Sequence, residues 1–210
     1  MGFNMDKRLV VRNRIDKPLY EHLGKLSKDT LELLNAIYDS EDEQDVMNIS
    51  VSLRENVDID AGNPMSDEYK AMIDAKKYHQ KLISKPSVEN PVDEYDWHDY
   101  DPKYERVIEE LKNIVGVDKF YRLRMAWMEP GERVEPHVDQ PHIDRLTMVM
   151  RGEHKFVLTV RGVDHEKIMK PGDIWYINTN WDHSVYTMND EPRLALLGCF
   201  VYNANKEDNK

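Results

Sequence analysis

The spacing of the hydrophobic residues changes near residue 118. Before that point, apolar positions recur every three or four residues in 30–40 and in 102–115, which is the period of an amphipathic helix. Ser27 or Asp29 can cap the first of these helices, and Gly116 can end the second. After residue 118, apolar and polar positions alternate, which is the period of a strand. The pattern predicts helices in the first half and β structure in the second.

Between the two helices the pattern is less regular. Residues 48–53 alternate as a short strand would, and the acidic run at 41–45 predicts a solvated loop. A further helix is expected to begin at Ser66. It should end by Lys85, because Pro86 disfavours helical backbone at the residue before it.

Eight strands are predicted in the second half, within about 85 residues. Turns such as Pro130-Gly131, Arg151-Gly152 and Pro171-Gly172 separate several of them. Many short strands at this spacing are typical of a closed or sandwiched antiparallel sheet of the jelly-roll kind. The expected strands are 121–128, 134–138, 145–150, 155–160, 166–170, 173–177, 183–187 and 193–202.

The length and the charge fit one acidic structural unit. The chain has 210 residues and a formal net charge of -11, from 29 Lys and Arg against 40 Asp and Glu. An acidic surface disfavours phosphate backbones and anionic membranes, so neither a nucleic acid nor a membrane is expected as a partner. We expect a helical N-terminal extension over 1–118 that packs on the barrel, a catalytic core over 119–203 and a tail over 204–210.

The expected compartment follows from features that the sequence lacks. Its apolar runs are shorter than the roughly 20 residues of a membrane helix, and its first residues hold no apolar stretch of signal-peptide length. Cys199 is the only cysteine, which excludes an internal disulfide and a cysteine-bound zinc ion. A cytoplasmic protein is therefore expected.

A histidine and a carboxylate stand two residues apart in Pro136-His137-Val138-Asp139. On a strand, residues i and i+2 point to the same face, so His137 and Asp139 would project together. Such a pair can supply two ligands of the 2-His-1-carboxylate triad that holds Fe(II) and leaves positions open for other ligands. Taken alone, the motif is more often a surface His–Asp pair, so the metal interpretation needs a third ligand.

His183 is placed to supply that third ligand, and Arg193 follows it by ten residues. Strands 183–187 and 193–199 are expected to form a hairpin in which His183 and Arg193 lie opposite each other on one face. A buried arginine needs an anion, and a dicarboxylate bound to the metal would supply one. The alternative is a surface position for Arg193, directly after Pro192.

The order His137-x-Asp139, His183, Arg193 resembles the pattern of the Fe(II)/2-oxoglutarate-dependent oxygenases. Within that superfamily, roughly residues 119–202 are similar to the aspartyl/asparaginyl β-hydroxylase-like group. The matching segments are Arg124-Met125 through Pro130-Gly131, Pro136 to Asp139, Arg145, Pro171 to Asn178, His183 to Val185 and Arg193-Leu194. The resemblance implies a mainly β protein, a double-stranded β-helix of the cupin-like jelly-roll kind, with N-terminal α-helices buttressing its major sheet.

The resemblance also implies roles for particular residues. Fe(II) would be bound by the catalytic residues His137, Asp139 and His183. The distal carboxylate of 2-oxoglutarate would be bound by Arg193. Arg145 stands where the group has a second basic residue near the cosubstrate. Two residues later the group often has a histidine, and Thr147 takes that place here.

The implied reaction is hydroxylation of a C–H bond with O2, while 2-oxoglutarate is converted to succinate and carbon dioxide. By analogy within the group, the substrate would be an amino acid, a peptide or a protein side chain. Three alternatives stay open: a cupin-type metalloenzyme without 2-oxoglutarate, a non-catalytic protein that binds a small acid, and a nucleic-acid base oxygenase. The net charge of -11 disfavours the last of these.

Several arginines near the motif allow two interpretations. Arg145 is either a cosubstrate contact or a strand-edge charge paired with Asp144 or Glu153. Arg122 and Arg124 alternate on one face of the first core strand, where they either line the substrate entrance or face solvent.

The remaining aromatic and polar residues are given simpler roles. Trp127 and Trp175 are expected in the barrel wall, and Cys199 is expected to be a small buried residue. The acidic and aromatic stretch 93–101 is either a lid or a solvated linker. His142 is a rival ligand, a loop residue or a substrate contact. Two histidines beside turns, His154 and His165, are expected to be exposed.

Overall fold

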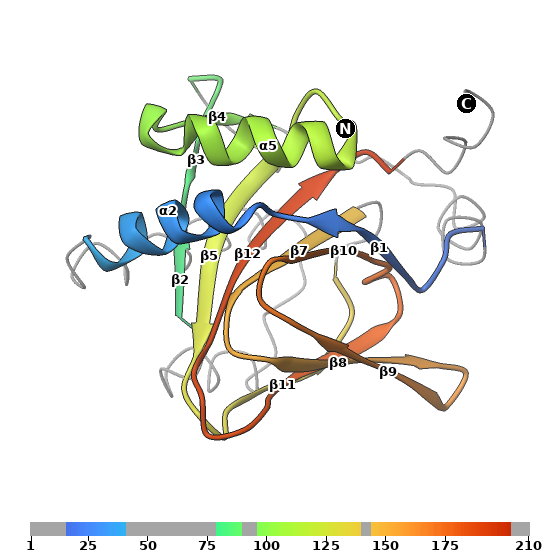
Figure 1. Ribbon diagram of the computed structural model, residues 1–210. Coiled ribbons are helices and arrows are strands. Elements are labelled where there is room, and N and C mark those ends of the chain that lie inside the picture. The colour runs from blue at the N-terminus through green and yellow to red at the C-terminus, as the bar shows by residue number, and fades with distance from the viewer. Residues whose placement is uncertain (1–15, 41–78, 90–95, 140–143, 203–210) are drawn as a thin grey trace.

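The computed structural model describes residues 16–40, 79–89, 96–139 and 144–202. Two sheets face each other in this part of the chain (Figure 1). The six-stranded major sheet has the order β1-β10-β7-β12-β5-β2, and the four-stranded minor sheet has the order β6-β11-β8-β9. All of their strand pairs are antiparallel. This confirms the predicted jelly roll.

The eight predicted strands are all present, with ends shifted by at most a few residues. They are β5 (Tyr121–Met128), β6 (Arg133–His137), β7 (Asp144–Arg151), β8 (His154–Val160), β9 (Val163–Met169), β10 (Asp173–Ile177), β11 (Asp182–Thr187) and β12 (Arg193–Phe200). The first half of the chain adds β1 (Tyr20–Lys25), β2 (His79–Leu82), β3 (Ser84–Lys85) and β4 (Asp99–Tyr100), of which β3 and β4 pair separately.

Two helices cover the outer face of the major sheet (Figure 1). Helix α2 (Lys28–Asp39) begins at Ser27, whose hydroxyl accepts the Thr30 N–H at 3.4 Å. Helix α5 (Glu105–Val115) follows a short 3-10 helix, η3 (Pro102–Tyr104), and ends at Gly116, which has a left-handed φ of 69°. Both helices were predicted, and of the two candidate caps for the first, Ser27 and Asp29, Ser27 is the one that caps it. Among the described residues, no helix is long and apolar enough to cross a membrane.

The alternation along the strands gives the major sheet two different faces. On β12, Leu194, Leu196 and Phe200 join the apolar cluster under the helices. The intervening residues, beginning with Arg193 and Ala195, therefore point into the barrel. The outer face of the major sheet therefore packs against the helices, and its inner face can form a site.

The expected helix from Ser66 does not extend to Lys85. The described part of that segment forms β2 and β3 instead, because its backbone pairs with other strands. The link between β2 and β3 follows the same edge, where the Ile83 N–H donates to the Leu123 carbonyl at 2.8 Å. The residues before His79 in that helix, the strand at 48–53 and the loop at 41–45 lie outside the described residues.

The predicted hairpin between 183–187 and 193–199 is wrong. Strand β11 belongs to the minor sheet and lies between β6 and β8, whereas β12 belongs to the major sheet and lies between β5 and β7. After β11 the chain crosses the end of the barrel, and the N–H groups of Thr187 and Met188 donate to the carbonyls of Glu132 and Glu153. The jelly roll thus brings β11 and β12 face to face across the interior.

Candidate active site

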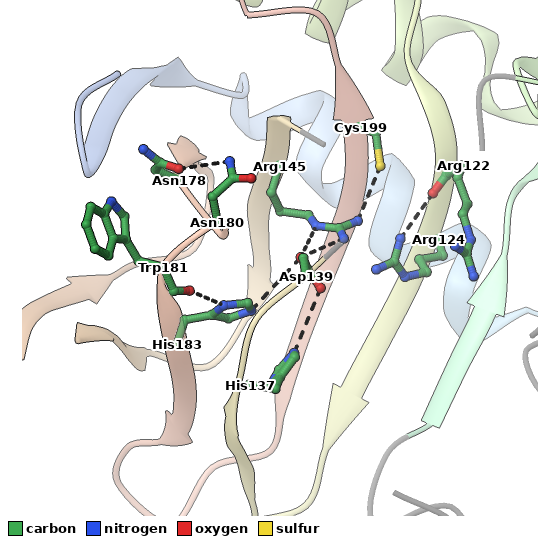
Figure 2. A network of polar contacts seen from close by, with 10 residues as sticks. All are labelled: Arg122, Arg124, His137, Asp139, Arg145, Asn178, Asn180, Trp181, His183 and Cys199. Atoms are coloured by element: carbon green, nitrogen blue, oxygen red, sulfur yellow. Dashed lines mark hydrogen bonds and ion pairs between the residues drawn. The ribbon is translucent and has the colours of Figure 1, made fainter. Parts of the chain in front are cut away.

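Three potential metal ligands meet inside the barrel near the end of β6. His137 is the last residue of β6, Asp139 follows two residues later, and His183 of β11 lies opposite His137 in the strand register. The Nε2 atoms of His137 and His183 lie 3.9 Å from Asp139 Oδ1 and 4.0 Å from Asp139 Oδ2 respectively. One ligand atom from each residue falls within 4.8 Å of the others. The structure therefore brings the predicted triad together (Figure 2).

Backbone carbonyls orient both histidines. His137 Nδ1 lies 2.8 Å from the Glu135 carbonyl, and His183 Nδ1 lies 3.1 Å from the Trp181 carbonyl. A carbonyl can only accept, so each Nδ1 carries a proton, and in a neutral imidazole this tautomer leaves the lone pair on Nε2. Those lone pairs are on the side of Asp139. This arrangement is common for metal-binding histidines, whose second nitrogen is held by a hydrogen bond.

The protonation states also fit a metal site. Burial lowers the pKa of His183 to about 4, against the opposing effect of the Asp139 carboxylate. Burial alone would raise the pKa of Asp139, but Arg145 and the two histidines hold it well below its usual range. Near neutral pH, His183 is therefore a neutral imidazole and Asp139 a carboxylate. Two imidazoles and one carboxylate form the donor set of the facial triad that suits Fe(II).

Arg145 is a direct partner of Asp139. Its Nε and Nη2 donate to Asp139 Oδ2 at 3.0 and 2.7 Å, and its Nη1 donates to Cys199 Sγ at 3.3 Å (Figure 2). The side chain is buried in the barrel beside the triad, which agrees with the interior position rather than with the strand-edge one. The cysteine is buried as well, as expected.

The triad forms part of a pocket between the two sheets, which spans about 390 Å³ including its opening to solvent. The major sheet lines it with Arg124, Arg145, Thr147, Arg193 and Leu197, and the minor sheet lines it with Val134, His137, Phe156, His183 and Val185. Asp139 and Thr179 complete the described lining. Three arginines thus face one carboxylate, so the pocket favours anionic ligands.

Arg193 faces this pocket even though the hairpin that predicted its direction does not exist. It is 2% exposed, so the surface alternative is wrong. Its Nη1 lies 3.5 Å from the Met128 sulfur, a weak acceptor. His183 and Arg193 lie on different sheets and reach the pocket from opposite walls.

Two polar residues of the lining, Arg124 and Thr179, were not predicted as site residues. For Arg124, the sequence left open whether it lines the substrate entrance or faces solvent. In the structure it lines the pocket and is 7% exposed. The signal was its alternation with Arg122, whose carbonyl accepts from Arg124 Nη1 at 3.4 Å. Thr179 had no signal, because it lies in the connection between β10 and β11. Its hydroxyl and that of Thr147 are buried and have no hydrogen-bond partner among the described residues.

The other sequence expectations have mixed outcomes. His165 is exposed, and Trp127 and Trp175 pack in the hydrophobic clusters, as predicted. His154 was expected to be exposed and is fully buried, because it occupies the inward-facing phase of β8 with Phe156 and Leu158. His142 and residues 93–95 lie outside the described residues.

The chain matches a protein-family model over more than half of its length. A family model described as aspartyl/asparaginyl beta-hydroxylase matches residues 89–201, which include every residue of the triad and all three pocket arginines. A search among curated proteins finds no match.

A solved structure shares the fold at low sequence identity, and others give weaker matches. A Pseudomonas putida prolyl-4-hydroxylase is 13% identical, with a TM-score of 0.51 over 93% of this chain and 98% of that chain. A recombinant oxalate oxidase in complex with glycolate is 14% identical, with a TM-score of 0.39 over 60% and 52%. The Drosophila melanogaster CENP-C cupin domain is 16% identical, with a TM-score of 0.34 over 39% and 67%. The match to another structure of the Drosophila melanogaster CENP-C domain covers 64% of that domain's length.

Proposed function

The chain belongs to the aspartyl/asparaginyl beta-hydroxylase family, and we propose that it is an Fe(II)- and 2-oxoglutarate-dependent hydroxylase. The observation that carries this proposal is the presence of two kinds of site in one pocket. The cluster of His137, Asp139 and His183 fits a metal ion, and the buried guanidinium of Arg193 fits an anion. A hydroxylase that uses a dicarboxylic cosubstrate needs both.

In this proposal, His137, Asp139 and His183 hold Fe(II). Bound iron, together with O2 and 2-oxoglutarate, would supply the oxidation that converts a substrate C–H bond into C–OH. The other products are succinate and carbon dioxide. The chain orients the ligands: the Glu135 and Trp181 carbonyls fix the two imidazoles, and Arg145 occupies Oδ2 of Asp139. Oδ1 of Asp139 remains on the side of His137 for the metal.

Arg193 is proposed to bind the distal carboxylate of 2-oxoglutarate. A guanidinium is costly to bury without an anion, and its planar fork binds a carboxylate through two parallel hydrogen bonds. Thr147 offers a buried hydroxyl donor on the same pocket wall, where the resembled group often has a histidine. Both residues therefore support a cosubstrate that carries a carboxylate at the end away from the metal.

The substrate is proposed to be an amino acid, a peptide or a protein side chain. Arg124 gives the pocket a further buried cation that the cosubstrate role of Arg193 does not use. The His137 side chain is 44% exposed, so the metal ligands are accessible to a substrate from this side. The chain's net charge of -11 is unfavourable for a nucleic-acid substrate.

The proposal is tested by product formation from 2-oxoglutarate. The full chain, loaded with Fe(II), is incubated with 2-oxoglutarate and O2, and succinate is quantified with and without candidate amino acids and peptides. We expect slow succinate release without substrate, faster release with a suitable one, and none from His183→Ala. If the protein binds 2-oxoglutarate but never forms succinate, it is a small-acid-binding protein. Metal binding without 2-oxoglutarate binding would indicate a cupin of another activity.

A further inference from the structure

His154 is a buried histidine to which the proposed reaction gives no role. It begins β8 on the face that it shares with Phe156 and Leu158, and it lies opposite Met169 of β9 and Thr187 of β11. It is 0% exposed, and neither of its ring nitrogens has a hydrogen-bond partner among the described residues. An unsatisfied buried polar group is costly, so each such group in a folded protein calls for an explanation.

The turn before His154 packs against the start of β12, where Arg193 lies. In the turn before His154, Gly152 has a φ of 66°, and a Cβ built there would lie 2.4 Å from the Pro192 carbonyl oxygen and 3.5 Å from Arg193 Cα. Only glycine permits this approach between the start of β8 and the start of β12. Burial, reinforced by the Arg193 guanidinium, lowers the pKa of His154 well below the usual value for histidine. The imidazole is therefore neutral and keeps one nitrogen lone pair.

A neutral hydrogen-bond acceptor is a suitable partner for those N–H groups of an arginine that do not bind the anion. A guanidinium has five N–H donors, and a bidentate carboxylate takes two of them. An acidic side chain behind Arg193 would compete with the ligand for its charge, whereas an imidazole accepts a hydrogen bond without neutralising the guanidinium. His154 does not line the pocket, whereas Arg193 does, so His154 can act on a ligand through Arg193.

We propose that His154 is a positioning residue for Arg193, an inference that rests on the proposed function. When a dicarboxylate occupies the pocket, the imidazole lone pair accepts a guanidinium N–H and fixes the plane in which Arg193 meets the distal carboxylate. The role of the histidine is thus to favour ligands long enough to reach Arg193. A 2-oxo acid without a distal carboxylate gains nothing from it.

The test compares two ligands on full-length protein loaded with redox-inert Zn(II). Binding of 2-oxoglutarate and of pyruvate is measured by calorimetry for wild type, His154→Phe and His154→Gln. We expect His154→Phe to weaken 2-oxoglutarate binding about tenfold and to leave pyruvate binding unchanged, because one hydrogen bond is lost. Gln offers a carbonyl acceptor, so His154→Gln should stay within about threefold of wild type. An equal loss for both ligands, or no loss for either, overturns the proposal.

A second measurement does not depend on how the variants fold. With 15N-labelled histidine, the ring nitrogens of His154 in the wild-type protein should shift when 2-oxoglutarate is added, and should not shift with pyruvate. Unchanged His154 resonances at saturating 2-oxoglutarate would refute the positioning role. Wild type that binds no 2-oxoglutarate would refute the proposed function as well. If Arg193→Gln abolishes 2-oxoglutarate binding while His154→Phe has no effect, only the His154 proposal fails.

Discussion

The inner faces of the two sheets present different chemistry to the pocket. The minor sheet contributes the imidazoles of His137 and His183, and the major sheet contributes the guanidiniums of Arg124, Arg145 and Arg193. Neither sheet alone combines a metal-binding group with an anion-binding group. The Asp139–Arg145 ion pair joins the two walls. The site is therefore complete only when the barrel closes, although His183 and Arg193 are only ten residues apart.

The outer faces differ as well. The major sheet is covered by α2 and α5 over an extensive apolar cluster that includes Leu111 and Leu146. The minor sheet ends at β9, where Val163 and Ile168 are exposed. Within the described part of the chain, the minor-sheet wall is therefore held mainly by strand pairing and by the barrel interior, whereas the major-sheet wall is also supported from outside by helices.

The largest expected effect comes from the minor-sheet wall. His183→Ala removes one of the three proposed metal ligands and should weaken Fe(II) binding by about 100-fold or more and abolish turnover. His165→Ala, an exposed histidine on β9 of the same sheet, should leave Fe(II) binding unchanged. Anaerobic Fe(II) titration measures both variants. Equal affinities in His183→Ala and wild type would mean that the cluster is not the metal site.

The next effect comes from the major-sheet wall. Arg193→Gln should weaken 2-oxoglutarate binding about 100-fold while leaving Fe(II) affinity within about twofold, since the metal ligands belong to the opposite wall. Arg106→Gln, on the exposed side of α5, serves as the charge-matched control. Calorimetry on the metal-loaded protein gives both affinities. The separation of the two walls would be contradicted if Arg193→Gln reduced metal and 2-oxoglutarate binding equally.

The outer faces can be compared through stability. Leu111→Ala removes a fully buried side chain between α5 and the major sheet and should lower the free energy of unfolding by about 3 kcal/mol. Ile168→Ala trims a side chain that is largely exposed on β9, so it should change that free energy by less than about 0.5 kcal/mol. Urea denaturation measures both. Similar losses would show that the minor sheet is supported as strongly as the major one.

The smallest expected effect is a pH dependence that comes from His154. Its pKa is lowered in the folded chain by burial and by Arg193, whereas an unfolded histidine takes up a proton near pH 6.5. Below that pH the unfolded state binds a proton that the folded state does not, so the free energy of unfolding falls as the pH falls. Between pH 6.5 and 5.5, wild type should lose about 1 kcal/mol more than His154→Gln. Parallel pH profiles would show that His154 titrates normally in the folded protein.

The sequence was sufficient for the eight barrel strands and for the pairing of His137 with Asp139, because both depend on short-range spacing. Alternation located all eight barrel strands, and the i, i+2 spacing correctly placed His137 and Asp139 together. It was insufficient for pairing between distant segments. Whether β12 returns beside β11 or crosses to the other sheet depends on the closure of the whole barrel, so the hairpin was wrong while the convergence of His183 and Arg193 was correct.

The same limit explains the residues whose roles were not predicted. Strands β1 and β2 lie at the two edges of the major sheet, where backbone pairing with β10 and β5 forms them without a strong hydrophobic pattern. His154 was placed at the surface because it follows a turn, but β8 begins at that residue and its first side chain points inward. Edge pairing and strand phase at a turn are decided by tertiary contacts rather than by local spacing.

One pocket is proposed to bind Fe(II) and a 2-oxo dicarboxylate together. This proposal is tested most directly by adding 2-oxoglutarate to the Fe(II)-loaded protein without oxygen and recording the metal-to-ligand charge-transfer band. We predict a band that saturates at one equivalent in wild type, is absent in His137→Ala, and needs about 100-fold more 2-oxoglutarate in Arg193→Gln. Wild type without a band, or a band that neither substitution alters, would contradict the account.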